Sequence, residues 1–237
     1  MAEHRHGRLD LLRLDDLGAF LEHRLGILGD QRPLLRERGE DHATGVLADL
    51  GVSSLQFDSE TRGFSFRFDA PLDMRMDAAG DEQTAAELLL RLSEEEIARI
   101  IFEYGEERNS RRIAKWIVEH REQGTPITTT KELADLVARA AGKHKHQRIH
   151  PATRTFQALR IAVNRELEGL APFVEEVVDL LETDGRFVVI SFHSLEDRIV
   201  KRTLGNLSGR CQCPPRVPRC ICGARKTVKV LTRRPIT

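Results

Sequence analysis

The sequence predicts an α/β fold that is interrupted by an all-helical stretch. Two short apolar runs, at 45–52 and 186–192, have the length and composition of buried parallel strands. The segment between them carries apolar residues at helical spacing and repeated helix-start signals from about residue 82 to residue 169. Helices and strands alternate again after this block, which favours a sheet with a helical insertion over a purely helical bundle.

The first part of the chain supplies the first strand. Residues 1–45 are rich in Arg and Asp, and within them 9–14 and 17–25 predict a short strand and a helix. The run 45–52 contains Asp49 and a following Gly, as a buried parallel strand does where it leaves its sheet.

Three phenylalanines follow at alternating positions. Phe64, Phe66 and Phe68 are separated by polar residues, which predicts a half-buried extended segment. Such aromatics either pack in the core or stack on a nucleic-acid base. We favour core packing, because alternating aromatics usually lie against a sheet or its neighbour.

The helical block has well-defined start signals. Ser-x-x-Glu at 93–96 and Thr-x-x-Glu at 129–132 are capping boxes, and Trp116 marks a helix between them. Pro151 opens a further helix, because proline suits the first helical turn. We expect Gly169 to end that helix, since glycine favours the position after a C-cap.

The last part of the chain returns to alternating elements. A helix is expected over 172–181, a turn at 184–185 and the second buried strand at 186–192. Another helix is expected over about 195–204 and a short strand over 227–231.

These elements divide the chain into three segments. Residues 1–77 and 166–237 are expected to be the two parts of one α/β domain, with 78–165 as an inserted helical domain.

In open α/β sheets, ligands bind beyond the carboxyl ends of the strands. The polar residues that follow the two predicted strands are therefore the candidate site. They are Asp49, Ser53, Ser54 and Gln56 after the first strand, and Ser191, His193, Ser194, Glu196 and Asp197 after the second.

Two of these residues have a structural alternative. Asp49 either orients a ligand or caps a turn, a position that Asp favours. His193 is a candidate for substrate contact or for proton acceptance. A hydrogen-bonded histidine with a purely structural role is an equally open interpretation.

Charge is balanced over the chain but segregated along it. The formal net charge of the 237 residues is zero. Nevertheless, 136–165 contain seven Lys or Arg, three His and no acid, and 198–237 contain eleven Lys or Arg and no acid. Such basic segments favour a nucleic-acid partner. The alternative is that they pair with the acidic stretch 81–107 inside the fold.

Hydrophobicity and cysteine usage indicate a cytoplasmic protein without a membrane partner. No apolar run approaches the roughly 18 residues of a membrane span, and charged residues interrupt the N-terminal region where a secretory signal would lie. The four cysteines, all between positions 211 and 222, argue against a disulfide scaffold.

The cysteines form two C-x-C pairs around a proline-rich loop. Four thiolates at short range suit a structural zinc ion, although C-x-x-C is the commoner spacing. Reduced cysteines without a metal are the alternative interpretation. We therefore assign no metal ligand from the sequence alone. The residues are Cys211, Cys213, Cys220 and Cys222.

Long, irregular motifs from about Gly45 onward resemble one enzyme family. They are DLGVSSLQFD at 49–58, RGFSFRFDAPLDMRMD at 62–77, YGEER at 104–108, HPATRTFQALRIAVNREL at 150–167 and SFHSLEDRIVKR at 191–202. In this order they resemble the bacterial small-subunit ribosomal RNA cytosine-N4 methyltransferases, the RsmH or MraW family. The family has Pro before the Gln of the first motif, where this chain has Leu55.

The resemblance implies an S-adenosylmethionine-dependent methyltransferase with a Rossmann-like domain and an inserted helical domain. The implied substrate is a cytosine of the small-subunit (16S) ribosomal RNA at the decoding centre, free or in the ribosomal subunit, and no DNA partner is expected. By the same resemblance, Asp49 and Gln56 contact the cofactor. Lys143, Lys145 and Arg148 are expected to contact RNA phosphates, with a solvated loop as the alternative.

The chain departs from the family pattern before Asp49. The family begins with a strand, a glycine-rich turn and a helix, followed by a strand that ends in an acid for the ribose hydroxyls. The 48 residues before Asp49 contain only isolated glycines. The methyltransferase domain is thus expected to be incomplete at its N-terminus. The chain is then a fragment of a full enzyme, a degenerate non-catalytic member that binds ribosomal RNA, or one part of a sheet that a partner chain completes. We adopt the first interpretation, and with it the methyltransferase function.

Overall fold

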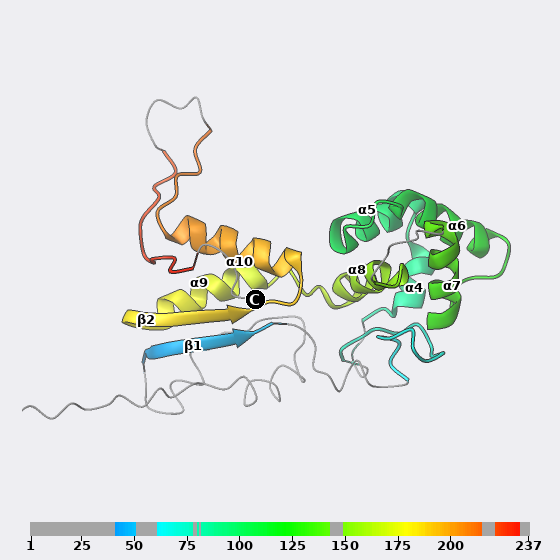
Figure 1. Cartoon of the computed structure of the whole chain (residues 1–237), viewed down its shortest axis with the longest axis horizontal. Helices are drawn as coiled ribbons and strands as arrows, with labels where there is room; N and C mark the ends of the chain where they lie inside the picture. The colour runs from blue at the N-terminus through cyan, green and yellow to red at the C-terminus, as the bar shows by residue number, and fades with distance from the viewer. Residues whose placement is uncertain are drawn as a thin grey trace, which may run out of the picture. The chain divides into compact units, whose positions relative to one another are not determined.

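The computed structural model consists of two compact units, which are described separately (Figure 1). The structure describes residues 41–50, 61–77, 80, 82–142, 149–214 and 221–232. The strand unit holds 41–50 and the described residues from 167 onward. The helical unit holds the described residues from 61 to 166.

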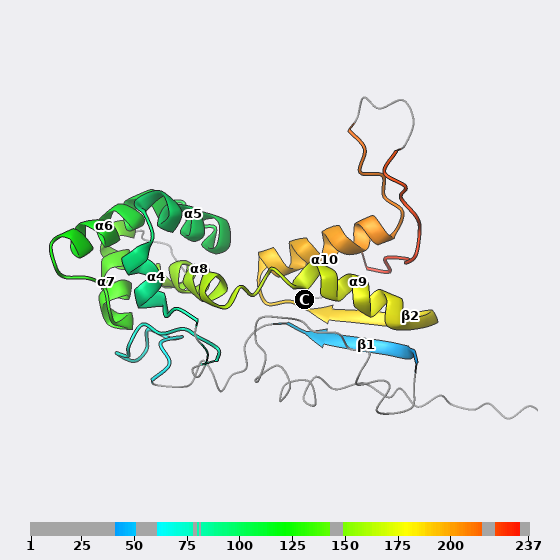
Figure 2. The ribbon, with the colours of Figure 1, turned by 180° about the vertical axis from the view of Figure 1, so that it is seen from behind.

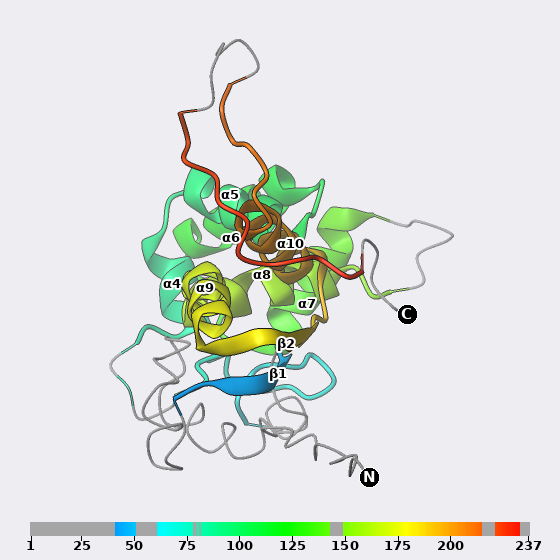
Figure 3. The same cartoon turned by 90° about the vertical axis from the view of Figure 1, so that its left-hand side faces the viewer.

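The strand unit is built on two parallel strands and two helices. They are β1 (Ala43–Asp49), α9 (Leu170–Leu180), β2 (Leu181–Ile190) and α10 (Ser194–Leu207). Both helices lie on the same side of the strands, as the opposite and end-on views show (Figures 2 and 3). Apolar side chains from all four elements form one core between the helices and the strands. The parallel α/β pairing predicted from the two apolar runs is confirmed.

Side chains of β1 alternate between the two faces of the sheet. Ala48 and Leu50 are buried in the core beneath the helices. Asp49 is exposed, because neighbouring side chains on a strand point to opposite faces. Its register partner is Ile190, so Asp49 stands at the carboxyl end of both strands. Ile190 and Val188 are also exposed, which leaves part of the second face of β2 apolar and uncovered.

β2 begins earlier than the sequence predicts, because it contains a bulge. Ala43 pairs with Leu181 and Gly45 with Arg186, so β2 advances five residues while β1 advances two. Asp184 has a φ of 67°, a left-handed conformation that Asp tolerates better than most residues. The predicted turn at 184–185 therefore lies inside the strand as a bulge.

The helical unit contains five helices. They are α4 (Ala85–Arg91), α5 (Glu94–Gly105), α6 (Ser110–Glu122), α7 (Thr130–Ala141) and α8 (Ala152–Asn164). The predicted capping boxes at the starts of α5 and α7 are confirmed: Glu96 accepts a hydrogen bond from Ser93 N at 2.9 Å, and Glu132 accepts one from Thr129 N at 3.0 Å. A further capping box at Thr84 starts α4 and was not predicted. None of the helices that the structure describes in either unit is long and apolar enough to span a membrane.

The α5 and α8 helices approach closely at Gly105. A Cβ atom there would lie 2.5 Å from the carbonyl oxygen of Arg154 and 3.2 Å from the Cβ of Ala158. Because real side chains do not tolerate such a distance, the absence of a side chain at Gly105 permits this contact. The YGEER motif thus contributes to helix packing.

Residues 61–77 pack with the helices rather than with the strands. Phe64, Leu72 and Met74 are buried in the same core as the apolar faces of α4 to α8. Leu72 N also donates a hydrogen bond to Thr128 O at 2.8 Å. The observed division therefore falls before residue 61, whereas the sequence places the boundary at 77. The motif at 62–77 contributes to the helical core.

The side chain of Asn164, at the end of α8, forms hydrogen bonds with the backbone of the loop after Phe68. Its Oδ1 accepts from Met76 N at 2.7 Å, and its Nδ2 donates to Met74 O at 2.8 Å. Nδ2 also donates at 2.8 Å to the carbonyl oxygen of Arg160, within α8. The amide thus uses both its donor and its acceptor on backbone groups, and its side chain is buried.

The α8 helix stops earlier than predicted. Arg165 takes the left-handed conformation, with a φ of 52°, directly after Asn164. Gly169 is the N-cap of α9 rather than the end of α8. The preference of helix ends for glycine pointed to Gly169. The helix instead ends at Arg165, which adopts the left-handed conformation that glycine usually takes at a helix end.

The three alternating phenylalanines have different environments. Phe64 is buried and Phe66 packs against His150 and Phe156, with ring centroids 4.6 and 5.1 Å apart. Phe68 is 39% exposed. Core packing is confirmed for the first two. The predicted extended segment is not observed, because turns and bends occupy most of it.

The described C-terminal residues contain one isolated bridge in place of the strand predicted at 227–231. The bridge joins Ser208 and Lys226 in antiparallel fashion. Thr227 N donates to Leu207 O at 2.8 Å, and Val228 N donates to the same oxygen at 3.2 Å. The end of α10 is thereby tied to the chain some twenty residues later.

Candidate functional site

The carboxyl ends of β1 and β2 form one edge, where the sequence places the candidate site. Leu50 N donates to Ile190 O at 2.9 Å, so the pairing continues to the end of both strands. Asp49 presents an exposed carboxylate at this edge. The turn 191–193 leaves β2 beside it and leads into α10. The structure therefore brings Asp49, the described residue of the first polar segment, to the same edge as the 191–193 turn of the second.

His193 is the N-cap of α10 and forms a reciprocal capping box with Glu196. Its Nδ1 accepts from Glu196 N at 3.4 Å. The Glu196 carboxylate accepts in turn from Phe192 N at 2.8 Å and from His193 N at 3.4 Å. The Nε2 atom of His193 lies 3.1 Å from Glu196 Oε1, at ion-pair distance but without hydrogen-bond geometry.

Glu196 is a buried carboxylate that this arrangement keeps ionised. Burial raises its pKa, but the His193 side chain and the Phe192 amide lower it more, so the net shift is downward. The sequence places Glu196 in the polar stretch after the second strand but assigns it no role. The signal was present, because Glu stands three residues after His193 and before an apolar helical run, as in a capping box.

The capping role bears on the chemistry expected of His193. Nδ1 is the acceptor of a backbone N–H, so the proton of the neutral ring resides on Nε2, which faces Glu196. The ring is mostly buried. Proton acceptance at Nδ1 would require this cap to open. The geometry favours a positioning role, in which His193 and Glu196 fix the turn beside Asp49.

Phe192 is a residue of this edge that sequence reasoning did not select. Its side chain is 70% exposed, although Phe is usually buried. It lies two residues after Ile190, the register partner of Asp49. A signal was available, because an aromatic residue follows the strand directly between Ser191 and His193.

Several predicted site residues lie outside the described residues. They are Ser53, Ser54 and Gln56 of the first motif, and Lys143, Lys145 and Arg148 of the basic loop. No contact of these residues is described, and their roles stay predictions.

One basic residue of α8 has a structural role. Arg160 forms a two-pronged ion pair with Glu166, with N–O distances of 2.9 and 3.0 Å, and both side chains are largely buried. It is thus not presented to RNA. Arg154, six residues earlier, is half exposed, and its guanidinium lies 3.9 Å from the Glu107 carboxylate.

The C-terminal segment is basic and uncovered. Every described residue after Thr203 is at least partly exposed. No acid occurs after Asp197 in the sequence. The described residues from 198 onward include seven bases: Arg198, Lys201, Arg202, Arg210, Arg225, Lys226 and Lys229.

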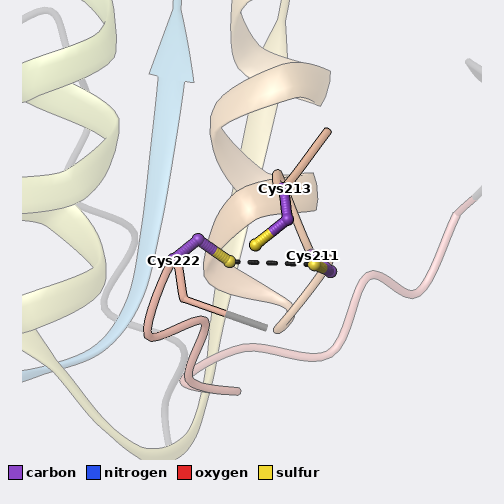
Figure 4. A group of neighbouring side chains, drawn as sticks. All are labelled: Cys211, Cys213 and Cys222. Carbon is purple, nitrogen blue, oxygen red and sulfur yellow. Dashed lines mark hydrogen bonds between the residues drawn. The ribbon is translucent and has the colours of Figure 1, made fainter. Parts of the chain in front are cut away.

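Three of the four cysteines come together in this segment (Figure 4). The sulfur atoms of Cys211, Cys213 and Cys222 all lie within 4.8 Å of one another. Cys220 lies outside the described residues.

A parallel strand pair with helices on one face is typical of an α/β protein, a class in which ligands bind beyond the carboxyl ends of the strands. Comparison with known proteins makes the class more specific. Residues 24–237 match the model of the MraW methylase family. The chain belongs to this family of methyltransferases, as the motifs indicate.

Curated relatives carry one common name. The chain is 50% identical over 226 residues to the ribosomal RNA small subunit methyltransferase H of Trichlorobacter lovleyi, covering 94% of this chain and 71% of the relative. It is 55% identical over 203 residues to the protein of that name from Geotalea daltonii, covering 85% and 64%. The Fusobacterium nucleatum protein of the same name is 48% identical over 199 residues, covering 84% and 62%. The chain thus spans about two thirds of the length of these relatives.

Proposed function

We propose that this chain catalyses S-adenosylmethionine-dependent methylation of N4 of a cytosine in small-subunit ribosomal RNA, at the decoding centre. The observation that carries the proposal is the edge where exposed Asp49 and the 191–193 turn lie together, in a member of the MraW methylase family. The names of the relatives support the RNA substrate. We further propose that the helical unit is a domain inserted into a Rossmann-like domain, and that the enzyme works in the cytoplasm, where ribosomal subunits are found.

The residues at the edge fit the cofactor. An exposed carboxylate beside the uncovered apolar side chains Val188 and Ile190 suits a ligand that combines positive charge with an aromatic base. We assign Asp49 and Gln56 to cofactor binding. When bound, S-adenosylmethionine supplies a methyl group on a positively charged sulfur.

The remaining task of the protein is to place the cytosine. The exocyclic amine is a weak nucleophile, because its lone pair is delocalised into the ring. Holding N4 in line with the methyl group therefore accounts for much of the catalysis. N4 accepts the methyl group and releases one proton to solvent. We propose that Phe192 stacks on the base and that His193 positions the turn that carries Phe192.

Calorimetric titration of the whole chain with S-adenosylmethionine tests the cofactor assignment. We expect micromolar binding by the wild-type chain and at least a tenfold loss in Asp49→Ala. Asp179→Ala, which removes an exposed carboxylate on α9, is the matched control and should bind normally. Equal affinity of the two variants would overturn the role of Asp49.

Methyl transfer from labelled cofactor to small-subunit ribosomal RNA tests the role of Phe192. Phe192→Ala should lower the transfer rate at least tenfold while cofactor affinity is retained. Phe102→Ala removes an equally conspicuous exposed phenylalanine from α5 and serves as the control. Equal rates in the two variants would refute the stacking role.

A second candidate function is RNA binding without catalysis. It is favoured by the acid-free, exposed C-terminal segment. It predicts salt-dependent RNA affinity together with a folded chain that binds no S-adenosylmethionine. That result in the titration would replace the methyltransferase proposal.

A further inference from the structure

The cysteine cluster joins two separate stretches of the C-terminal segment. Cys211 and Cys213 lie on one stretch, and Cys222 lies on the other (Figure 4). The sulfur atoms of Cys211 and Cys222 are 3.8 Å apart. A disulfide bond would bring two sulfurs to about 2.05 Å. The observed distance is therefore that of two neighbouring thiols, and no disulfide joins them.

The distance agrees with shared coordination of one ion. Zinc–sulfur bonds are about 2.3 Å long, and the tetrahedral angle then separates two ligating sulfurs by about 3.8 Å. The third sulfur lies within 4.8 Å of both others, so about 1 Å of side-chain adjustment closes the site. Three soft sulfur donors in this geometry select zinc over magnesium or calcium.

Backbone amides support the sulfur atoms in a crossed pattern. Gln212 N, next to Cys211, donates to the Sγ atom of Cys222 at 3.5 Å. Ile221 N, next to Cys222, donates to the Sγ atom of Cys213 at 3.2 Å. Each stretch thus donates to a thiolate of the other. Such outer hydrogen bonds orient the ligands of a metal ion and stabilise their negative charge.

Among the described residues around the cysteines, no buried apolar cluster holds the two stretches together. All described residues after Thr203 are at least partly exposed, and Ile221 is among the most exposed apolar residues described. The base of the loop is fixed through the hydrogen bonds of Thr227 and Val228 to Leu207 O. Small segments of this kind gain their structure from a metal ion or a disulfide.

Charge at the site also suits a metal–thiolate centre. A zinc ion with three thiolates carries a net charge of −1, and each further thiolate adds another. Arg210 and Arg225 flank the cysteines in sequence, and no carboxylate occurs in the segment. The positive charges of Arg210 and Arg225 would therefore compensate the negative charge of the metal centre.

We propose that Cys211, Cys213 and Cys222 bind a structural zinc ion that fixes the basic C-terminal segment. Binding exchanges the thiol protons for the metal and involves no oxidation. The proposal rests on these three described cysteines and is independent of the proposed methyl transfer. A further donor, such as a water molecule, completes the tetrahedron.

Metal analysis of the whole chain, purified without a metal-affinity tag or chelator, is the first test. We expect about one zinc per chain. Cys211→Ser and Cys222→Ser should each lose at least nine tenths of the zinc, whereas Gln212→Ala, between two of the ligands, should keep it. The fluorescence of Trp116, the single tryptophan, should be unchanged in all variants, which shows that zinc loss is not caused by unfolding of the helical unit.

Cobalt replacement and proteolysis give independent readouts. Cobalt(II) should produce the intense visible absorption of a tetrahedral thiolate site in the wild-type chain and lose it in Cys213→Ser. Removal of zinc by a chelator should speed tryptic cleavage after Arg210 and Arg225 at least tenfold. A wild-type chain that takes up less than one tenth of an equivalent of zinc, or that contains a disulfide among these cysteines, would overturn the proposal. So would cysteine variants that retain as much zinc as Gln212→Ala.

Discussion

Replacement of Asn164 by Ala tests whether the end of α8 is fastened as described. The side chain is 1% exposed and makes three hydrogen bonds to backbone groups, at Met76 N, Met74 O and Arg160 O. Each is worth about 1 kcal/mol net, and Asn164→Ala leaves the partners at Met74 and Met76 buried and unsatisfied. We therefore expect the free energy of unfolding of the helical unit to fall by about 3 kcal/mol.

The assay is urea unfolding followed by the fluorescence of Trp116, which packs against the core of the helical unit. With a slope of about 1.5–2 kcal/mol per molar urea, the midpoint should fall by roughly 1.5–2 M. Asn206→Ala, in the strand-unit helix α10, is the control and should leave the Trp116 midpoint unchanged. A shift below about 0.5 M for Asn164→Ala would refute the reasoning, since it would show that water or neighbouring groups replace these bonds.

Two further predictions follow from the packing and the cap. Gly105→Ala should lower the free energy of unfolding that Trp116 reports by about 1–3 kcal/mol, because its Cβ would meet the Arg154 carbonyl. Gly205→Ala has open space around its Cβ in α10 and should stabilise that helix by about 0.5–1 kcal/mol in a circular dichroism melt. No loss in Gly105→Ala would contradict the close contact. Glu196→Ala should speed hydrogen exchange of the Phe192 and His193 amides at neutral pH by about tenfold or more. Because the folded-state pKa of Glu196 is lowered, its stabilisation is complete above its ordinary pKa of 4.5 and is lost as the pH falls through the folded value. The difference between wild type and Glu196→Ala should therefore shrink below pH 4.5, and a pH-independent difference would exclude this mechanism.

The sequence predicts those helices and strands that depend on residues close together in the chain. The boxes at Ser93 and Thr129 start helices as expected, because a side chain and a backbone amide three residues apart suffice to form them. The two apolar runs pair in parallel, and Asp49 stands at the edge that the strand-end rule selects.

The features that sequence reasoning missed depend on residues far apart in the chain. The motif at 62–77 joins the helical unit because Asn164, 88 residues after Met76, accepts from its backbone. Gly169 looks like a helix end, but α8 stops at Arg165 once Asn164 is held in place. The sequence places His193 just after the second strand, and the structure has it there as the N-cap of α10; its role in a site stays a prediction. The sequence alone could not show that the His193 side chain caps α10, because this depends on its distance to Glu196.

The fastening at Asn164 also has a consequence for the order in which the chain folds. The strands β1 and β2 are separated along the chain by 131 residues, from 50 to 180. Once Met76 and Asn164 are in contact, the chain that must still be closed into a loop between the two strands is about 42 residues long. Closing the shorter loop costs about 1 kcal/mol less conformational entropy. The helices therefore speed strand pairing when they assemble first, and a variant that loosens Asn164 should slow the appearance of the parallel pair.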